Sequence, residues 1–265
     1  MKLVDCFIFY NEMDLLTYRL NLLNGVVDHF VLVEATRTFA GNPKPLHYAE
    51  NQKLFEAFRD KITHVVVDDF PFPRESIDYE KKQQWLNETC QRNAISRGLE
   101  GLALAPDDLI LVTDVDEIPD RRTLEAIKAG AVPVSLNVLE MDFYYYNLRH
   151  KFDSKWQHAK IVRLDRLTMS CDDLRQLHCR QYCNNIQNGG WHLSYFGDAA
   201  YIQNKIKNFS HQELNLERFT DLEKIEKRVR EGGDLYDRNN DLRRVELDCN
   251  PNLPLEHDAF LKMFY

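Results

Sequence analysis

Four carboxylates follow a run of apolar residues in the stretch LILVTDVDEIPD, residues 109–120. They are Asp114, Asp116, Glu117 and Asp120. Carboxylates repel one another, and burying them without a partner is costly. Mg²⁺ and Mn²⁺ prefer oxygen ligands and typically take one or two carboxylates, with water and substrate phosphates completing the shell. A divalent cation with a diphosphate ligand would explain the acidic run, and a solvated acidic turn is the alternative.

Two chemistries use a D-x-D pair placed after an apolar strand. In a glycosyltransferase that uses a nucleotide sugar, Asp116 would bind the metal directly, and Asp114 would bind a ribose or a metal-bound water. In a phosphohydrolase, Asp114 would be the nucleophile, but that pattern usually lies on the first strand. A third possibility is a non-catalytic glycan-binding protein on a transferase scaffold.

The acidic run must be positioned by the elements that surround it. We predict strands over residues 3–9, 30–34, 64–69 and 109–113, and helices over residues 15–23, 51–59 and 79–99. Alternating strands and helices are typical of an α/β fold with a mostly parallel sheet and helices on both faces. Ligands bind such sheets at the carboxyl ends of the strands, which is where the acidic run falls.

The second half of the chain has a different pattern. Residues 134–147 are rich in β-branched and aromatic side chains, and residues 160–164 form another predicted strand. This pattern indicates an antiparallel C-terminal extension of the sheet. Residues 199–231 are predicted to be mostly helical and to end at Gly232 and Gly233. Because no linker separates the halves, we expect residues 1–265 to form a single domain.

Composition excludes several classes of partner. The net charge is −8, whereas nucleic-acid binding normally needs a basic excess. There is no apolar run long enough for a membrane span, and the segment MKLVDCFIFYNEMD is a poor signal peptide. We therefore expect a soluble cytoplasmic protein that does not bind nucleic acid. The oligomeric state is not predicted.

The cysteines suggest one further candidate metal site. Cys171, Cys179 and Cys183 lie near His178, but their spacing matches no standard zinc knuckle. Reduced thiols are the expectation for a chain of this size without an export signal.

Three blocks of the sequence resemble glycosyltransferase family 17. They are residues 11–48, VTDVDEIPD at 112–120 and GGWHLSYFG at 189–197. The resemblance implies a GT-A fold, an inverting transfer, and Mn²⁺ or Mg²⁺ at the D-x-D pair. It also implies a nucleotide-sugar donor, with UDP-GlcNAc suggested by family members that transfer N-acetylglucosamine. Residues 1–120 would form the nucleotide-sugar-binding half and residues 121–265 the acceptor-binding half.

We expect the protein to differ from the animal members of the family, which are longer and carry a membrane anchor and stem. The acceptor is therefore expected to be a glycan, and not necessarily the animal N-glycan. His192, which follows two glycines and Trp191, is the candidate third metal residue beside Asp114 and Asp116, because neutral imidazole is a good Mn²⁺ ligand. The alternative is a buried histidine bonded to the backbone.

The resemblance also assigns residues to the donor. Asn11 and Glu12 follow the first strand and Glu34 ends the second, where a GT-A fold holds the base and ribose. Asn11 can instead cap the next helix. Arg92 and Asn93 precede the acidic strand, and Arg92 would pair with the diphosphate or form a surface salt bridge.

An inverting transfer needs a carboxylate to take the proton of the acceptor hydroxyl. The candidates are Glu117, Asp142 and Glu213, with Glu117 preferred. A salt-bridge or capping role is the alternative for Glu117. The aromatic residues 143–146, with Trp156, would form part of an acceptor platform, although alternate residues of a strand face opposite sides.

Overall fold

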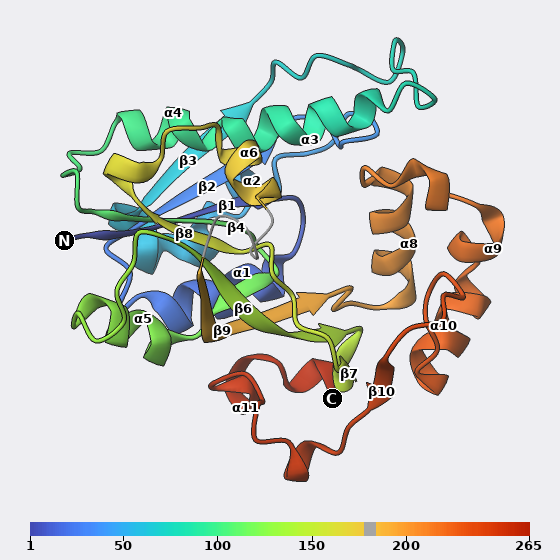
Figure 1. Ribbon diagram of the computed structural model, residues 1–265. Coiled ribbons are helices and arrows are strands. Elements are labelled where there is room, and N and C mark those ends of the chain that lie inside the picture. The colour runs from blue at the N-terminus through green and yellow to red at the C-terminus, as the bar shows by residue number, and fades with distance from the viewer. Residues whose placement is uncertain (178–183) are drawn as a thin grey trace.

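The computed structural model describes residues 1–177 and 184–265 and is built on one sheet of ten strands. The strand order is β10-β7-β6-β8-β4-β1-β2-β3, with β5 and β9 attached beside this path (Figure 1). The strands are β1 (Leu3–Phe9), β2 (His29–Ala35), β3 (Ile62–Val67), β4 (Leu109–Asp114), β5 (Glu117–Pro119), β6 (Leu136–Tyr145), β7 (Asn147–Phe152), β8 (Lys160–Arg163), β9 (Asn184–Ser194) and β10 (Leu242–Arg244).

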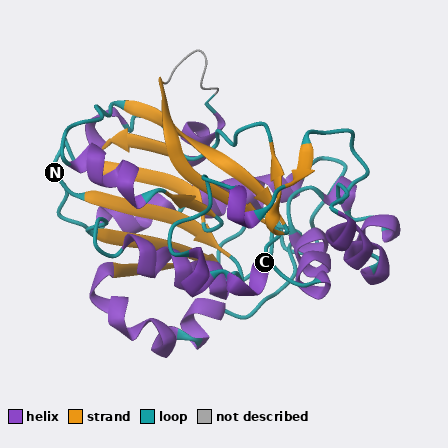
Figure 2. Cartoon of the chain, turned by 90° about the horizontal axis from the view of Figure 1, so that it is seen from below, coloured by secondary structure: helices purple, strands orange, loops and turns teal. Residues whose placement is uncertain are grey.

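Helices lie on both faces of the sheet (Figure 2). They are α1 (Met13–Leu23), α2 (His47–Glu50), α3 (Gln83–Asn93), α4 (Ile95–Glu100), α5 (Arg121–Lys128), α6 (Cys171–Gln176), α8 (Ala199–Asn208), α9 (Glu217–Thr220), α10 (Leu222–Glu231) and α11 (His257–Phe260). Short 3-10 helices cover Gln52–Lys61, Leu164–Arg166, Gln212–Leu214, Leu247–Cys249 and Lys262–Phe264.

The parallel half consists of β3, β2, β1 and β4. Alternate residues of each strand enter different cores, because side chains alternate across a sheet. Leu3 and Phe7 of β1 pack with the α1 side, while Val4 and Cys6 pack with the side covered by α4 and α6. Burial on both faces explains why these strands are continuously apolar. The predicted α/β class is confirmed.

The antiparallel extension begins at β8, which pairs with β4 and β6. Strands β7 and β10 continue it outward. Strand β9 runs parallel to β6 and antiparallel to β5, and its register places His192 opposite Glu117. The fold thus brings the GGWH segment beside the acidic run, although Glu117 and His192 are 75 positions apart in the sequence.

The long helix predicted over residues 79–99 is divided. Asp78 accepts hydrogen bonds from the backbone amides of Glu80 and Lys81, and Lys82 has a left-handed conformation with φ 57°. Helix α3 therefore begins only at Gln83, and α4 follows a break at Ala94. The predicted stop of α10 is confirmed, with Gly232 at φ 72°.

Two expectations concern the membrane and the cysteines. In the described parts of the chain, every helix is too short or too polar to cross a bilayer. The expected cytoplasmic location stays a prediction. His178, Cys179 and Cys183 lie outside the described residues, and the Cys171 thiol is free and buried.

Candidate active site

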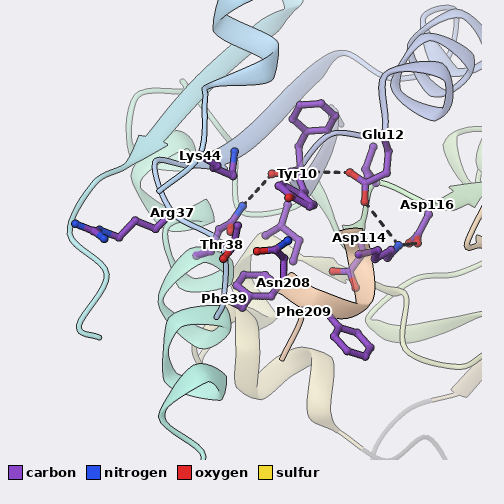
Figure 3. Close-up of a pocket in the computed structure, with 15 residues that line it drawn as sticks. Tyr10, Glu12, Arg37, Thr38, Phe39, Lys44, Asp114, Asp116, Asn208 and Phe209 are labelled. Carbon is purple, nitrogen blue, oxygen red and sulfur yellow. Dashed lines mark hydrogen bonds and ion pairs between the residues drawn. The ribbon is translucent and has the colours of Figure 1, made fainter. Parts of the chain in front are cut away.

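Two cavities meet at the carboxyl ends of β1 and β4. The inner cavity is lined by Tyr10, Glu12, Thr38, Phe39, Lys44 and Asn208, among others. Figure 3 shows Glu12 and Asp116 on one side of it and Arg37 and Lys44 on the other. The outer cleft is lined by Phe143, Tyr145, Trp156, His158, Arg175 and His192, among others. Both cavities are bordered by Phe39, Asp114, Asp116, Lys205 and Phe209.

Asp114 ends β4 and is held by two guanidinium groups. Its carboxylate oxygens lie 3.2 Å from Arg92 Nη2 and 2.7 Å from Arg175 Nη2. Burial nevertheless raises the pKa of Asp114, because it outweighs both arginines and is assisted by the nearby charges of Glu117 and Asp116. The Asp114 carboxylate is therefore only partly compensated within the protein.

Glu117 is fully buried and has a partner for each oxygen. Arg175 donates to both carboxylate oxygens at 2.7 Å, the Asp114 amide donates to Oε2 at 2.8 Å, and Trp156 Nε1 donates to Oε1. Burial by itself would raise the pKa of Glu117, but these partners, Arg175 first, hold that pKa at about 2. The carboxylate is thus ionised at neutral pH and a weak base in this state.

Asp116 points to the border between the cavities. Its Oδ2 accepts a hydrogen bond from Lys205 Nζ at 2.9 Å, and its Oδ1 lies 3.6 Å from His192 Nε2. Burial acts to raise the pKa of Asp116, but Lys205 and His192 overcome it and hold the pKa far below its usual value. Asp116 is therefore an ionised carboxylate in contact with one ammonium group and one imidazole.

His192 is fixed by aromatic neighbours and by the glycines before it. Its ring stacks on Phe143 at 4.8 Å between centroids and lies 4.1 Å from Trp156. Gly190 has φ 143°, and a Cβ there would lie 2.1 Å from the carbonyl oxygen of Ile118. The paired strands can approach this closely only because residue 190 is glycine. Nδ1 of His192 is buried and has no hydrogen-bond partner in residues 1–177 and 184–265.

The Asp116–His192 pair fits a small divalent cation. Two ligand atoms 3.6 Å apart can both reach one ion at about 2.1 Å, the usual distance for Mg²⁺. Asp114 does not join them, since its oxygens face Arg92 and Arg175. Within the described ranges, no three His, Cys, Asp or Glu side chains form a metal-binding group. The arrangement suits a site with two protein ligands, completed by water and phosphate oxygens.

The predicted donor residues divide into two groups. Glu12 lines the inner cavity, and its Oε2 caps the backbone amides of Tyr10 and Asn11 at 3.1 and 3.0 Å. Glu34 lies behind this wall, fully buried, where it accepts a hydrogen bond from the Tyr48 amide and contacts His64 at 3.1 Å.

Arg92 and Asn93, the donor candidates of α3, belong to the buried network around Asp114. Arg92 is buried against Glu88, Asp114 and Asp172, and Asn93 accepts a hydrogen bond from the Asp172 amide at 2.9 Å. Both residues therefore support the acidic strand end from the side of α3.

The three candidate bases are not brought together. Asp142 is buried in β6 and forms ion pairs with Lys151 at 2.5 Å and Lys155 at 2.8 Å. Glu213 is exposed and pairs with His211 at 2.6 Å. Glu117 alone contacts the D-x-D segment, through the Asp114 amide.

The predicted aromatic platform is partly core. Tyr144 and Tyr146 are buried and donate hydrogen bonds to backbone carbonyls. Phe143, Tyr145 and Trp156 line the outer cleft, which agrees with the alternation expected along a strand. Phe143 stacks on Phe152 as well as on His192, so both of its ring faces are occupied.

Sequence reasoning missed Arg175 and Lys205, the two basic residues whose side chains lie closest to the carboxylates of Asp114, Asp116 and Glu117. The excess of carboxylates indicated that cations were needed there. It could not indicate which of the 34 Lys and Arg side chains would supply them. Both lie on helices whose place in the fold is set by packing and not by a local motif.

A parallel sheet whose acidic strand end borders two adjoining cavities is typical of nucleotide-sugar-dependent glycosyltransferases. Sequence comparison agrees, since the profile described as Glycosyltransferase family 17 matches residues 1–241. The chain belongs to glycosyltransferase family 17.

Individual relatives are similar over part of the chain. The β-1,4-mannosyl-glycoprotein 4-β-N-acetylglucosaminyltransferase of Rattus norvegicus is 34% identical over 122 residues, which is 45% of this chain and 22% of that protein. The human enzyme of the same name is 36% identical over 113 residues, 42% of this chain and 20% of that protein. The match thus spans about a fifth of the length of these relatives.

A solved structure is also similar. It is a mannosyltransferase from Pyrobaculum calidifontis in complex with GDP-Man and Mn²⁺. The identity is 13% and the TM-score 0.43, with 78% of this chain and 61% of that chain covered.

Proposed function

We propose that this protein is a metal-dependent, inverting glycosyltransferase that moves N-acetylglucosamine from UDP-GlcNAc to a hydroxyl of a glycan. The observation that carries the proposal is a shortage of positive charge at the border of the two cavities. Among the described residues, ion pairs join six carboxylates at and behind this border to three basic side chains: Glu12, Glu88, Asp114, Asp116, Glu117 and Asp172, with Arg92, Arg175 and Lys205. A diphosphate, itself an anion, would be repelled unless another cation entered with it.

Asp116 and His192 would hold this cation, which we take to be Mn²⁺ or Mg²⁺. When bound, it would neutralise charge that develops on the leaving diphosphate. Asp114 would contribute through a bound water or the ribose, as its oxygens already face Arg92 and Arg175. Carboxylate and imidazole ligands suit Mn²⁺ well.

The inner cavity would hold the donor nucleotide. Its wall comes mainly from residues 1–120, and Glu12 is the carboxylate best placed to accept hydrogen bonds from ribose hydroxyls. Asn11, Glu34, Arg92 and Asn93 would support this wall.

The outer cleft would hold the acceptor glycan. Its lining comes mainly from residues 121–265, including Tyr145 and Trp156, and aromatic side chains provide apolar surface with a polar edge. The acceptor would lose its proton to a carboxylate, for which Glu117, Asp142 and Glu213 are the candidates. The contacts of Glu117 favour a positioning role, because a carboxylate with pKa about 2 that is held by Arg175 takes a proton poorly.

Transfer to a glycan tests this proposal. Purified protein would be incubated with UDP-GlcNAc, Mn²⁺ and a panel of glycans, and the products followed by mass spectrometry and by NMR of the new anomeric centre. We expect one glycan class to gain a single N-acetylhexosamine with inverted configuration. Phosphate release without sugar transfer would instead support the phosphohydrolase alternative. Glycan binding without turnover would support the non-catalytic one.

A further inference from the structure

Lys205 of α8 lies where the inner cavity and the outer cleft meet, and it lines both. Its Nζ donates a hydrogen bond to Asp116 at 2.9 Å and lies 3.7 Å from Glu12 Oε1. Only 19% of its side chain is exposed, and the ammonium group also faces the ring of Tyr195 at 5.5 Å from the centroid. A cation is thus held where the two cavities meet, in contact with the Asp116 carboxylate that faces His192.

An ammonium group has three N–H donors, and the two carboxylates facing Lys205 account for at most two of them. The lysine side chain is also a flexible stem that can move its charge by rotating about several bonds. Lys205 can therefore exchange one oxygen partner for another without any movement of α8. Burial acts to lower the pKa of Lys205, but Asp116 and the other neighbours raise it well above its usual value, so the group stays charged.

The contact with Asp116 has a second consequence. Lys205 occupies Oδ2 of the same carboxylate whose Oδ1 faces His192. While the ammonium group remains there, it repels a divalent cation and offsets the charge that would attract one. A phosphate oxygen that drew Lys205 away would leave Asp116 free to bind the metal.

We propose that Lys205 is a phosphate-binding residue that changes partner from Asp116 to the donor diphosphate, so that the nucleotide and the metal bind together and each only weakly alone. This inference rests on the proposed function and assigns a role to a residue that neither the D-x-D motif nor His192 indicates. The exchange breaks no covalent bond. It replaces one charge-assisted hydrogen bond with another of similar strength.

Three variants separate this role from a simple ion pair. K205M removes the charge but keeps much of the apolar stem, and K205R keeps the charge. K207M removes a charge from an exposed residue two positions further along the same helix and serves as the matched control. Circular dichroism and thermal unfolding would confirm that each variant is folded.

Binding would be measured by calorimetry for UDP and for uridine with Mn²⁺ present, and for Mn²⁺ alone. We expect K205M to weaken UDP binding about tenfold or more, as loss of a charged hydrogen bond implies, and to leave uridine binding unchanged. Mn²⁺ alone should bind K205M more tightly than the wild type, because Asp116 is released. K205R and K207M should both resemble the wild type.

Two outcomes keep this inference distinct from the proposed function. If wild-type protein binds UDP and K205M binds it equally well, Lys205 does not contact phosphate and the inference fails. If K205M loses UDP and uridine binding equally, the residue supports the cavity only, and the inference again fails. If wild-type protein binds no nucleotide diphosphate with or without Mn²⁺, the proposed function itself fails.

Discussion

Arg175 links Asp114 to Glu117: its Nη2 lies 2.7 Å from a carboxylate oxygen of each. One guanidinium group of α6 thereby fixes the first carboxylate of the D-x-D segment and the glutamate that follows it. Its planar fork suits such bidentate contacts. The geometry of the acidic strand end consequently depends on a helix about sixty residues further along the chain.

Replacing Glu117 by Gln should destabilise the protein. The amide cannot balance the charge of Arg175, and breaking a buried ion pair by removing one partner costs about 3 to 5 kcal/mol. Since Asp114 remains beside Arg175, we expect a loss near 3 kcal/mol in the free energy of unfolding, measured with denaturant. Exposed Glu213 provides the control, and E213Q should change stability by less than about 0.5 kcal/mol. Equal stabilities for E117Q and wild type would contradict the assigned ion pair.

The pH dependence of stability should also report on the ion pair between Glu117 and Arg175. The pKa of Glu117 is about 2 in the fold, against an ordinary value of 4.5. A carboxyl group with a depressed pKa stabilises the fold above its unfolded value and loses that contribution as the pH falls through its folded value. Stability should therefore drop between pH 4.5 and 2 by on the order of 3 kcal/mol from this residue. In E117Q the drop should be smaller by that amount. If the free energy of unfolding fell equally with pH in E117Q and wild type, the depressed pKa assigned to Glu117 would be wrong.

Turnover by E117Q distinguishes the two roles considered for Glu117. A catalytic base should lose about 10²- to 10⁴-fold in kcat, with little change in metal affinity. A positioning residue should lose less in kcat, and Mn²⁺ binding should weaken because Asp114 and Arg175 shift together. We expect the second pattern, measured by steady-state kinetics and Mn²⁺ titration.

Removing a proposed metal ligand should abolish tight Mn²⁺ binding in the presence of UDP. We expect this for D116N and H192A, each measured by calorimetry or by the EPR signal of free Mn²⁺. Asp120 ends the same acidic run but caps α5, where it accepts a hydrogen bond from the Arg122 amide. D120N keeps a good capping side chain and should bind Mn²⁺ as the wild type does. Equal losses of Mn²⁺ affinity in D120N and D116N would mean that the acidic run attracts the metal only through its total charge.

Gly190 should tolerate no side chain. Its φ of 143° is rarely adopted by other residues, and a Cβ would approach the Ile118 carbonyl oxygen to 2.1 Å. We expect G190A to lose well over 2 kcal/mol of stability and to displace His192, with weaker Mn²⁺ binding as a second sign. Gly130 also has a positive φ, of 76°, but open space around it, so G130A should cost only about 1 kcal/mol. Similar losses of stability in both variants would show that backbone strain, and not the close approach to the Ile118 carbonyl, accounts for the loss in G190A.

Several features of the fold were predictable from local sequence. Apolar segments alternating with helical ones predicted β1 to β4, and the position of Asp114 and Asp116 after the fourth predicted strand indicated a site at the carboxyl edge. The stop at Gly232 followed from its freedom to adopt positive φ. The start of α3 at Gln83 was not predictable in this way, because it depends on the turn formed by the Asp78 side chain and on the conformation of Lys82.

The residues that contact the acidic run could not be predicted from local sequence, for a different reason. Strand β9 contains Gly189 and Gly190, which disfavour strands, so its pairing with β5 is set by tertiary contacts. That pairing places His192 beside the acidic run, a position that only the resemblance to glycosyltransferase family 17 had suggested, and the packing of α6 and α8 places Arg175 and Lys205 there. Each of these contacts joins residues more than fifty positions apart, beyond the reach of local pattern.

Donor turnover tests the central claim most directly. Wild type and D116N would be incubated with UDP-, GDP- and other nucleotide sugars, each with Mn²⁺ or with EDTA, and nucleotide release would be followed in the presence of the glycan panel. We predict release from UDP-GlcNAc by the wild type with Mn²⁺, and none with EDTA or from D116N. Release that is unaffected by EDTA and by D116N would contradict the assignment of the acidic strand end as a metal site for a nucleotide-sugar donor.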